Sequence, residues 1–166
     1  PTGAGDALTD YLKDVSALSC EVTAASFPDE PLRIRTDYAK DVHAGHVISL
    51  HLEEGTSLTA VMDITSEGAG FAALQTLFEL EEDAHLTLVQ ILRPDQQFTL
   101  VNDIGGHVGN RADVHIIHLM LGGKNIYQGC RVNLAGTSSA LKADIGYRLQ
   151  GESMLDMNYY AYHTGK

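Results

Sequence analysis

The chain has 166 residues, 44% of them hydrophobic, and its 22 acidic and 11 basic residues give a net charge of −11. This charge repels phosphate backbones and anionic lipid headgroups, so nucleic acid and membrane surfaces are poor partner classes. No apolar run approaches the roughly 20 residues of a membrane span, and the start of the chain lacks a secretory signal. We therefore expect a cytoplasmic protein whose length corresponds to one domain.

Residues 1–45 differ in pattern from the rest, and we interpret them as an N-terminal helix and a segment that leads into the following repeats. Apolar residues recur at helical spacing from Ala7 to Leu18, and Asp6 is a suitable residue to cap the first turn. Two prolines in the run Phe27–Pro31 interrupt regular structure, and a strand is expected near Leu32 to Thr36.

From residue 46 onward, turn signals recur about every fourteen residues. One set of turns begins at residues 52, 80, 108 and 134, and a second set is centred near 66, 94, 122 and 150. Between turns, apolar and polar residues alternate, most clearly from Leu141 to Leu149. A repeat of about 28 residues with two strands per coil predicts a β-solenoid, in which Leu52, Leu80 and Val108 stack.

An antiparallel sandwich or barrel is the alternative, because these folds also have many short strands separated by turns. Three features favour the solenoid. The repeat holds for two full cycles, apolar residues flank the same turn each time, and the hairpin dipeptide Asn-Gly never occurs.

The eight histidines raise the possibility of a metal site. With a 28-residue register, His51, Glu79 and His107 form one outward column, and imidazole and carboxylate both suit zinc or ferrous iron. A solvated polar ladder is the alternative interpretation of this column. His115 and His118 should point to opposite faces of one strand, and His43 and His46 are interpreted as solvated loop residues.

Two cysteines, Cys20 and Cys130, lack the spacing of a zinc site or a redox pair, as expected for a reducing compartment. Cys20 is expected to end the first helix. Cys130 shares the inward side of its strand with Val132 and Leu134, so its thiol should point toward the core and act as a small hydrophobe. A role in handling a metal cluster is the alternative.

Evidence for catalysis is sparse. The glycine-rich run Asp103–Gly109 is interpreted as a solenoid corner, and no motif for a nucleophile or a phosphate loop occurs. A carbohydrate-active β-helix lyase or hydrolase would need outward acids and cations. The candidate acids are Asp63, Asp113, Asp144 and Asp156, and the candidate cations are Arg131, Arg148 and Lys142.

Several stretches together resemble the SufB/SufD scaffold family of the SUF system for iron–sulfur cluster assembly, and they lean toward SufD-like sequences. The resemblance covers about residues 31–166, through their order and spacing more than through any single motif. The stretches are Pro31–Thr36, Val47–Leu58, Tyr127–Leu134, Gly136, Leu141–Tyr147 and Met157–Lys166.

The resemblance implies a right-handed parallel β-helix over residues 46–166. For the complete protein, it also implies a non-enzymatic scaffold role beside a SufB-like protein and the SufC ATPase. The chain stops at His163–Lys166, where family members continue, so we expect a fragment that lacks the C-terminal part with the family's cluster-associated cysteine and histidine. No cofactor is therefore expected here, an iron–sulfur cluster is expected only in the complete assembled complex, and His163 is only a weak candidate ligand.

A solenoid that stops in mid-stack exposes a strand edge, so a homodimer through Leu155–His163 is expected. Two other functions remain open at this point. One is the carbohydrate-active enzyme, and the other is a purely structural solenoid module.

Overall fold

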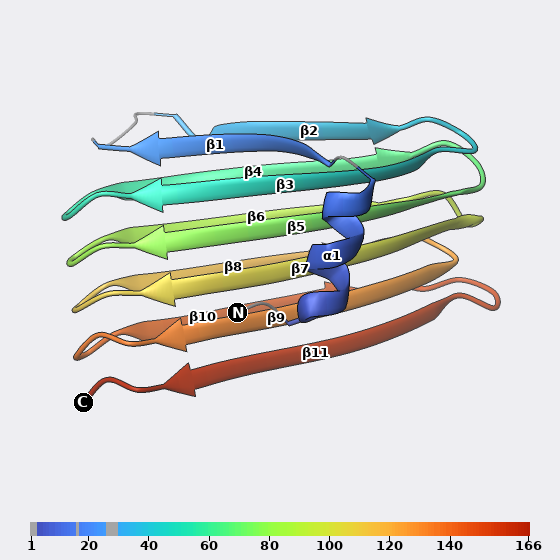
Figure 1. Ribbon diagram of the computed structural model, residues 1–166. Coiled ribbons are helices and arrows are strands. Elements are labelled where there is room, and N and C mark those ends of the chain that lie inside the picture. The colour runs from blue at the N-terminus through green and yellow to red at the C-terminus, as the bar shows by residue number, and fades with distance from the viewer. Residues whose placement is uncertain (1–2, 16, 26–29) are drawn as a thin grey trace.

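The computed structural model describes residues 3–15, 17–25 and 30–166. These residues form one helix and a succession of strands that alternate between two stacked sheets (Figure 1). The elements are α1 Asp6–Asp14, β1 Leu18–Ala24, β2 Leu32–Tyr38, β3 His43–Leu52, β4 Ser57–Ser66, β5 Gly70–Leu80, β6 His85–Arg93, β7 Phe98–Val108, β8 Asp113–Met120, β9 Asn125–Leu134, β10 Ala140–Tyr147 and β11 Met154–His163.

Every strand pairing is parallel, and the strand order follows the coils. One sheet has the order β1-β3-β5-β7-β9-β11 and the other β10-β8-β6-β4-β2. Leu52 pairs with Leu80 and Leu80 with Val108, which is the predicted stack. The parallel β-solenoid is thus confirmed, and the antiparallel sandwich is wrong.

The core lies between the two sheets and is filled by the inward residues of each strand. Leu50, Leu74, Leu88 and Ile116 are at most 1% exposed and belong to one continuous apolar cluster. Because the side-chain period of a strand is two, one column enters this core while the next faces outward. Burial of the inward column therefore fixes which face of every strand points inside.

One corner of the coils repeats an unusual backbone conformation. Gly55, Asp83, Arg111 and Ser138 all have φ between 52° and 69° and lie one coil apart. The backbone N–H groups of Gly55, Asp83 and Arg111 each donate to a carbonyl of the next coil. Only the first of these positions is a glycine, so the coil-to-coil hydrogen bonds hold the other three in a conformation that side chains disfavour.

The N-terminal region differs from the sequence prediction. Helix α1 ends at Asp14, its N-cap is Gly5, and no side chain caps it, so the capping role expected of Asp6 is wrong. Leu18 and Cys20 lie in β1, which pairs with β3, and Leu18 is 70% exposed. Pairing with β3 satisfies the backbone of this segment and overrides the helical spacing of its apolar residues.

The strand expected near Leu32 to Thr36 is confirmed as β2, although the interruption expected at Phe27–Pro31 lies mostly outside the described residues. Strands β1 and β2 pair with β3 and β4, so they belong to the same two sheets as the later coils. Helix α1 lies across the outer face of the β3-β5-β7 sheet, where Leu8 and Leu12 pack with Ala73 (Figure 1). The division of the chain at residue 45 stays a prediction.

Candidate functional site

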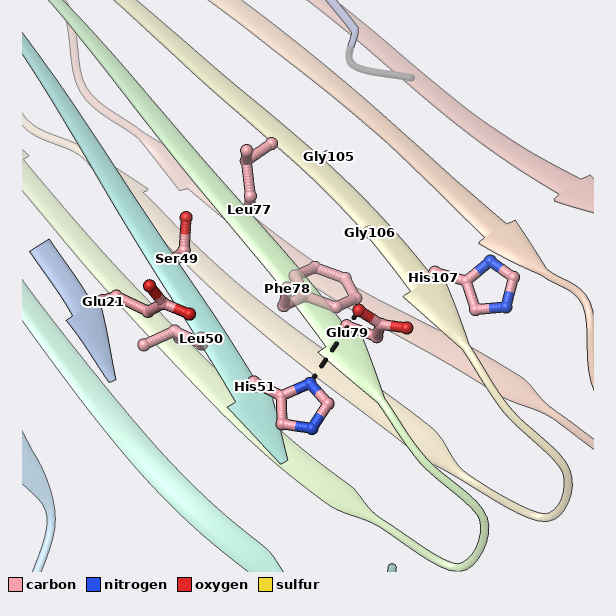
Figure 2. A pocket seen from close by; sticks show the side chains of 10 residues that line it. All are labelled: Glu21, Ser49, Leu50, His51, Leu77, Phe78, Glu79, Gly105, Gly106 and His107. Carbon is pink, nitrogen blue, oxygen red and sulfur yellow. Dashed lines mark ion pairs between the residues drawn. The ribbon is translucent and has the colours of Figure 1, made fainter. Parts of the chain in front are cut away.

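A shallow groove of about 490 Å³ lies on the outer face of β3, β5 and β7. Figure 2 shows its polar rim, with His51 and His107 on either side of Glu79. The groove is also lined by Glu21, Ser49, Leu77, Phe78, Gly105 and Gly106. Because the groove crosses several coils, its side chains come from positions about 28 residues apart in the sequence.

The predicted column of His51, Glu79 and His107 exists, because each residue is the register partner of the next. His51 Nδ1 lies 3.8 Å from Glu79 Oε2, and its Nε2 lies 3.1 Å from Glu81 Oε1. His107 instead contacts Asn133, with its Nδ1 3.5 Å from Asn133 Nδ2. Across residues 3–15, 17–25 and 30–166, no three His, Cys, Asp or Glu side chains come close enough to hold one metal ion.

The glycines beneath the groove are not at a corner, so that part of the sequence interpretation is wrong. Gly105 and Gly106 lie inside β7, and only Gly109 follows the end of that strand. A Cβ atom at Gly106 would lie 2.0 Å from the ring of Phe78, the residue paired with it in β5. Gly106 is therefore required by the close packing of an aromatic ring from the neighbouring coil.

Cys130 points into the core, as its parity predicted, and is completely buried. Burial, with a smaller contribution from nearby Asp103, raises the pKa of its thiol to about 12. A thiol in this environment stays protonated at neutral pH and is a poor nucleophile. Cys20 is exposed on β1, and His163 is exposed at the end of β11, far along the chain from the groove residues.

The sequence interpretation missed a hydrogen-bonded polar cluster inside the solenoid, which we call the inner polar cluster. Gln90 Nε2 donates to Thr76 Oγ1 at 3.0 Å, and Asn102 Nδ2 lies within 3.1 Å of acceptors on three neighbouring side chains. The signal was present, because each member is a polar residue at an inward position of its strand. The cluster consists of Thr76, Gln90, Asn102, His118 and Gln128.

His118 is the titratable member of this cluster. It lies on the face opposite to His115, as predicted, and is completely buried. Its Nδ1 is 2.7 Å from Tyr159 Oη, and burial lowers its pKa to about 4. The imidazole is therefore neutral at physiological pH, and the same environment raises the pKa of the Tyr159 hydroxyl.

The loop placement predicted for His43 and His46 is wrong for both residues, and the predicted solvation is wrong for His46. Both residues lie in β3, and His46 is half-buried with its Nδ1 3.1 Å from Tyr38 Oη. Burial lowers the pKa of His46. The strand begins earlier than the turn signals indicated, because β3 pairs with β5 from His43 onward.

The outward carboxylates considered for carbohydrate chemistry are bound to neighbours from adjacent coils. Asp63 accepts from Arg93 at 2.7 Å, Asp113 pairs with His85, and Asp144 lies 2.6 Å from His115 Nε2. Arg93 was not among the cations proposed from the sequence. Hydrogen bonds from His115 and then Lys142 lower the pKa of Asp144, which favours a fixed carboxylate over a proton donor.

Asp156, the fourth candidate acid, is on β11 and lines a separate small pocket of about 180 Å³ with Gly3, Ala4 and Asn158. Among the described residues, these acids therefore do not form an acid pair around one cleft.

Comparison with protein families gives a match over residues 34–166 to the model described as "SUF system FeS cluster assembly, SufBD core domain". The chain belongs to this family, and so the protein takes part in iron–sulfur cluster assembly by the SUF system. A search among curated proteins found no significant match, and neither did a search among solved structures. Among the described residues, no helix is long and apolar enough to cross a membrane.

Proposed function

We propose that the protein is a cytoplasmic, non-enzymatic scaffold of the SUF system, of the SufD type, that binds a SufB-like protein and the SufC ATPase. Membership of the SufBD core family supports the system, and the lean of the resemblance over residues 31–166 toward SufD-like sequences supports the type. In this role the solenoid holds partners in place and catalyses no step itself.

The observation that carries the proposal is the match of residues 34–166 to the SufBD core family. The apolar edge formed by β10 and β11, which we call the β10–β11 edge, is where the described strands can accept a further strand, either from a following coil or from a partner. Within the described residues, β11 pairs only with β9 and β10 only with β8. Half of the backbone groups of such a strand face away from its neighbour and can pair with another strand. The exposed apolar side chains of this edge are Ile145, Tyr147, Met154, Met157, Tyr160 and Tyr162.

These side chains suit a protein partner. The aromatic and methionine side chains are of the kinds enriched at interfaces, and each of the six is at least 39% exposed. Arg131 lies 5.9 Å from the ring centroid of Tyr162 and adds a cation beside the aromatic surface. An apolar partner strand would therefore bury side chains while it completes the backbone hydrogen bonds of β11.

The chemistry of the polar groups supports binding over turnover. The outward acids Asp63, Asp113 and Asp144 are engaged by Arg93, His85 and His115. Cys130 is buried and protonated at neutral pH. Neither set provides the free nucleophile or the acid pair that an enzyme of this shape would need.

In the absence of its partners, we propose that the chain forms a homodimer through the same edge, centred on Leu155–His163. Size-exclusion chromatography with light scattering should give twice the monomer mass of 17.9 kDa at high concentration. A mass of 17.9 kDa at every concentration would remove the homodimer and leave the hetero-complex to be tested separately.

The direct test of the scaffold is affinity capture of purified SufB-like and SufC-like proteins on the immobilised chain. A double variant, Met157→Lys with Tyr160→Lys, should weaken capture by roughly tenfold or more, because it places two charges in the apolar edge. The control is Leu18→Lys, which charges an apolar residue on β1, at the other end of the stack, that is even more exposed than Met157 and Tyr160. Equal capture by both variants would show that the β10–β11 edge does not bind the partners.

A further inference from the structure

The inner polar cluster contains an amide whose hydrogen-bonding requirements the protein alone does not meet. Asn102 is completely buried in β7 and projects into the solenoid interior. Its Oδ1 has no hydrogen-bond partner among the described residues. Buried side-chain oxygens of this kind almost always have a donor, from the protein or from a bound molecule.

The orientation of the Asn102 amide is fixed by its neighbours. Gln128 donates its own Nε2 to the carbonyl of Gly129 at 2.7 Å, so its Oε1 must be the atom that faces Asn102, at 2.6 Å. Rotation of the Asn102 amide by 180° would set two oxygens against each other at this distance. Asn102 must therefore present Nδ2 to Gln128, and its Oδ1 stays turned away.

The same nitrogen faces more acceptors than it has hydrogens. Asn102 Nδ2 carries two hydrogens, and it lies 2.7 Å from Gln90 Oε1, 2.6 Å from Gln128 Oε1 and 3.1 Å from His118 Nε2. Rotation of the Gln90 amide would set its Nε2 against Asn102 Nδ2, two donors at 2.7 Å, so Gln90 keeps its Oε1 toward Asn102 and its Nε2 on Thr76 Oγ1 at 3.0 Å. One of the three acceptors must therefore share a hydrogen, while Oδ1 receives none.

The tautomer of His118 does not remove this shortage. A hydrogen on Nε2 would point at the amide hydrogens of Asn102, so the ring hydrogen belongs on Nδ1, where Tyr159 Oη accepts it at 2.7 Å. The Nε2 atom is then an acceptor. Among the described residues, the titratable group hydrogen-bonded to His118 is Tyr159, which is neutral, and its hydrogen-bond and register partners Gln90, Asn102 and Ile145 carry no charge.

We infer that the solenoid interior binds one ordered water molecule that donates to Asn102 Oδ1 and to one of the acceptors crowded around Asn102 Nδ2. A water molecule has two donor hydrogens, which matches the two unmet acceptors, and it adds no charge to a buried site. The site therefore belongs to a small neutral donor. Ammonium is another small donor, but it would place a positive charge in the buried site, which costs far more free energy than a neutral water molecule.

The test is a crystal structure of the complete 166-residue chain at about 1.5 Å resolution, from crystals grown without ammonium salts, together with water–protein cross-relaxation measured by NMR. We expect a density peak within hydrogen-bonding distance of Asn102 Oδ1 and cross-peaks between water and the side-chain amide of Asn102. The outer-face variant Asn133→Leu, a matched substitution on neighbouring β9, should keep both signals, whereas Asn102→Leu should lose them.

Three outcomes would overturn the inference, even if Asn102→Leu fails to fold. The wild-type density could show a protein donor on Asn102 Oδ1. The peak could appear only after a soak in ammonium chloride, which would assign the site to ammonium. The wild-type structure could show neither a peak nor a water cross-peak at Asn102.

Discussion

The two faces of each strand are stabilised by different interactions. In β6, Leu86, Leu88 and Leu92 point inward and are at most 1% exposed, whereas His85 and Arg93 on the outer face pair with acids of neighbouring coils. Burial of an aliphatic side chain stabilises a protein by a few kcal/mol, but an exposed ion pair contributes about 0–1 kcal/mol. The inner face should therefore determine the free energy of unfolding. Residues of the outer face can then serve binding at little cost in stability.

The largest effect should come from the aliphatic inner face. We expect Leu88→Ala to lower the free energy of unfolding by about 3–4 kcal/mol, because Leu88 is completely buried and its removal leaves a cavity. Chemical denaturation monitored by circular dichroism measures this change. The outward neighbour Thr87→Ala is the control and should change stability by less than about 0.5 kcal/mol. Equal losses in the two variants would contradict the contrast between the faces.

The polar part of the inner face should make stability depend on pH. Burial lowers the pKa of His118 to about 4, below its ordinary 6.5, so the unfolded chain binds the proton more readily than the folded one. The contribution of neutral His118 to the free energy of unfolding is therefore complete above pH 6.5. It is lost as the pH falls toward 4, by roughly 3 kcal/mol in total.

Denaturation curves between pH 4 and 7 test this dependence. His118→Gln should flatten the curve in this window, whatever its effect on stability at pH 7. The outward control Thr87→Ala, which removes no titratable group, should keep the slope of the wild type. If His118→Gln keeps the wild-type slope, the titrating group lies elsewhere.

A smaller loss of stability is expected from substitution of Gly106, which lines the groove. Gly106→Ala places a methyl group 2.0 Å from the Phe78 ring, and such overpacking typically costs about 1–3 kcal/mol. Replacement of the ring by a smaller side chain in Phe78→Leu should reduce the stability cost of the added methyl group. A double-mutant cycle should therefore show a coupling between the two substitutions, and simple additivity would contradict the proposed contact.

The smallest effect should come from the outer face itself. Arg111 pairs with Glu82 and Asp83, its neighbours in the adjacent coil, and hydrogen bonds from Arg111 lower the pKa of Asp83. Because these groups are exposed, Arg111→Ala should cost less than about 1 kcal/mol, and the cost should shrink in high salt. Thermal unfolding at two salt concentrations measures this, and a large, salt-independent loss would contradict the account.

The spacing of the turns predicted the solenoid and its register well. Leu52, Leu80 and Val108 stack because a fixed repeat in a parallel stack places equivalent residues in neighbouring coils. The same register correctly aligned His51, Glu79 and His107. Column positions follow from sequence alone because they depend on counting residues and not on side-chain conformation.

The remaining features depend on contacts that a linear pattern does not contain. Leu18 fits the helical spacing, but its backbone pairs with β3 and the residue lies in a strand. Gly106 faces the ring of a residue one coil away, and Gln90 and Asn102 meet across the interior from different sheets. The rings of His51 and His107 also contact different partners, Glu81 and Asn133, and the strand register does not reveal these side-chain directions.

Hydrogen exchange of β11 amides tests the central claim, that the chain acts by binding SUF partners at the β10–β11 edge, most directly. On addition of a SufB-like protein and the SufC ATPase, exchange in Met154–His163 should slow markedly, while β5 and β6 should be unchanged. Unchanged exchange in β11 under conditions that saturate a demonstrated complex would place the contact elsewhere and contradict the claim.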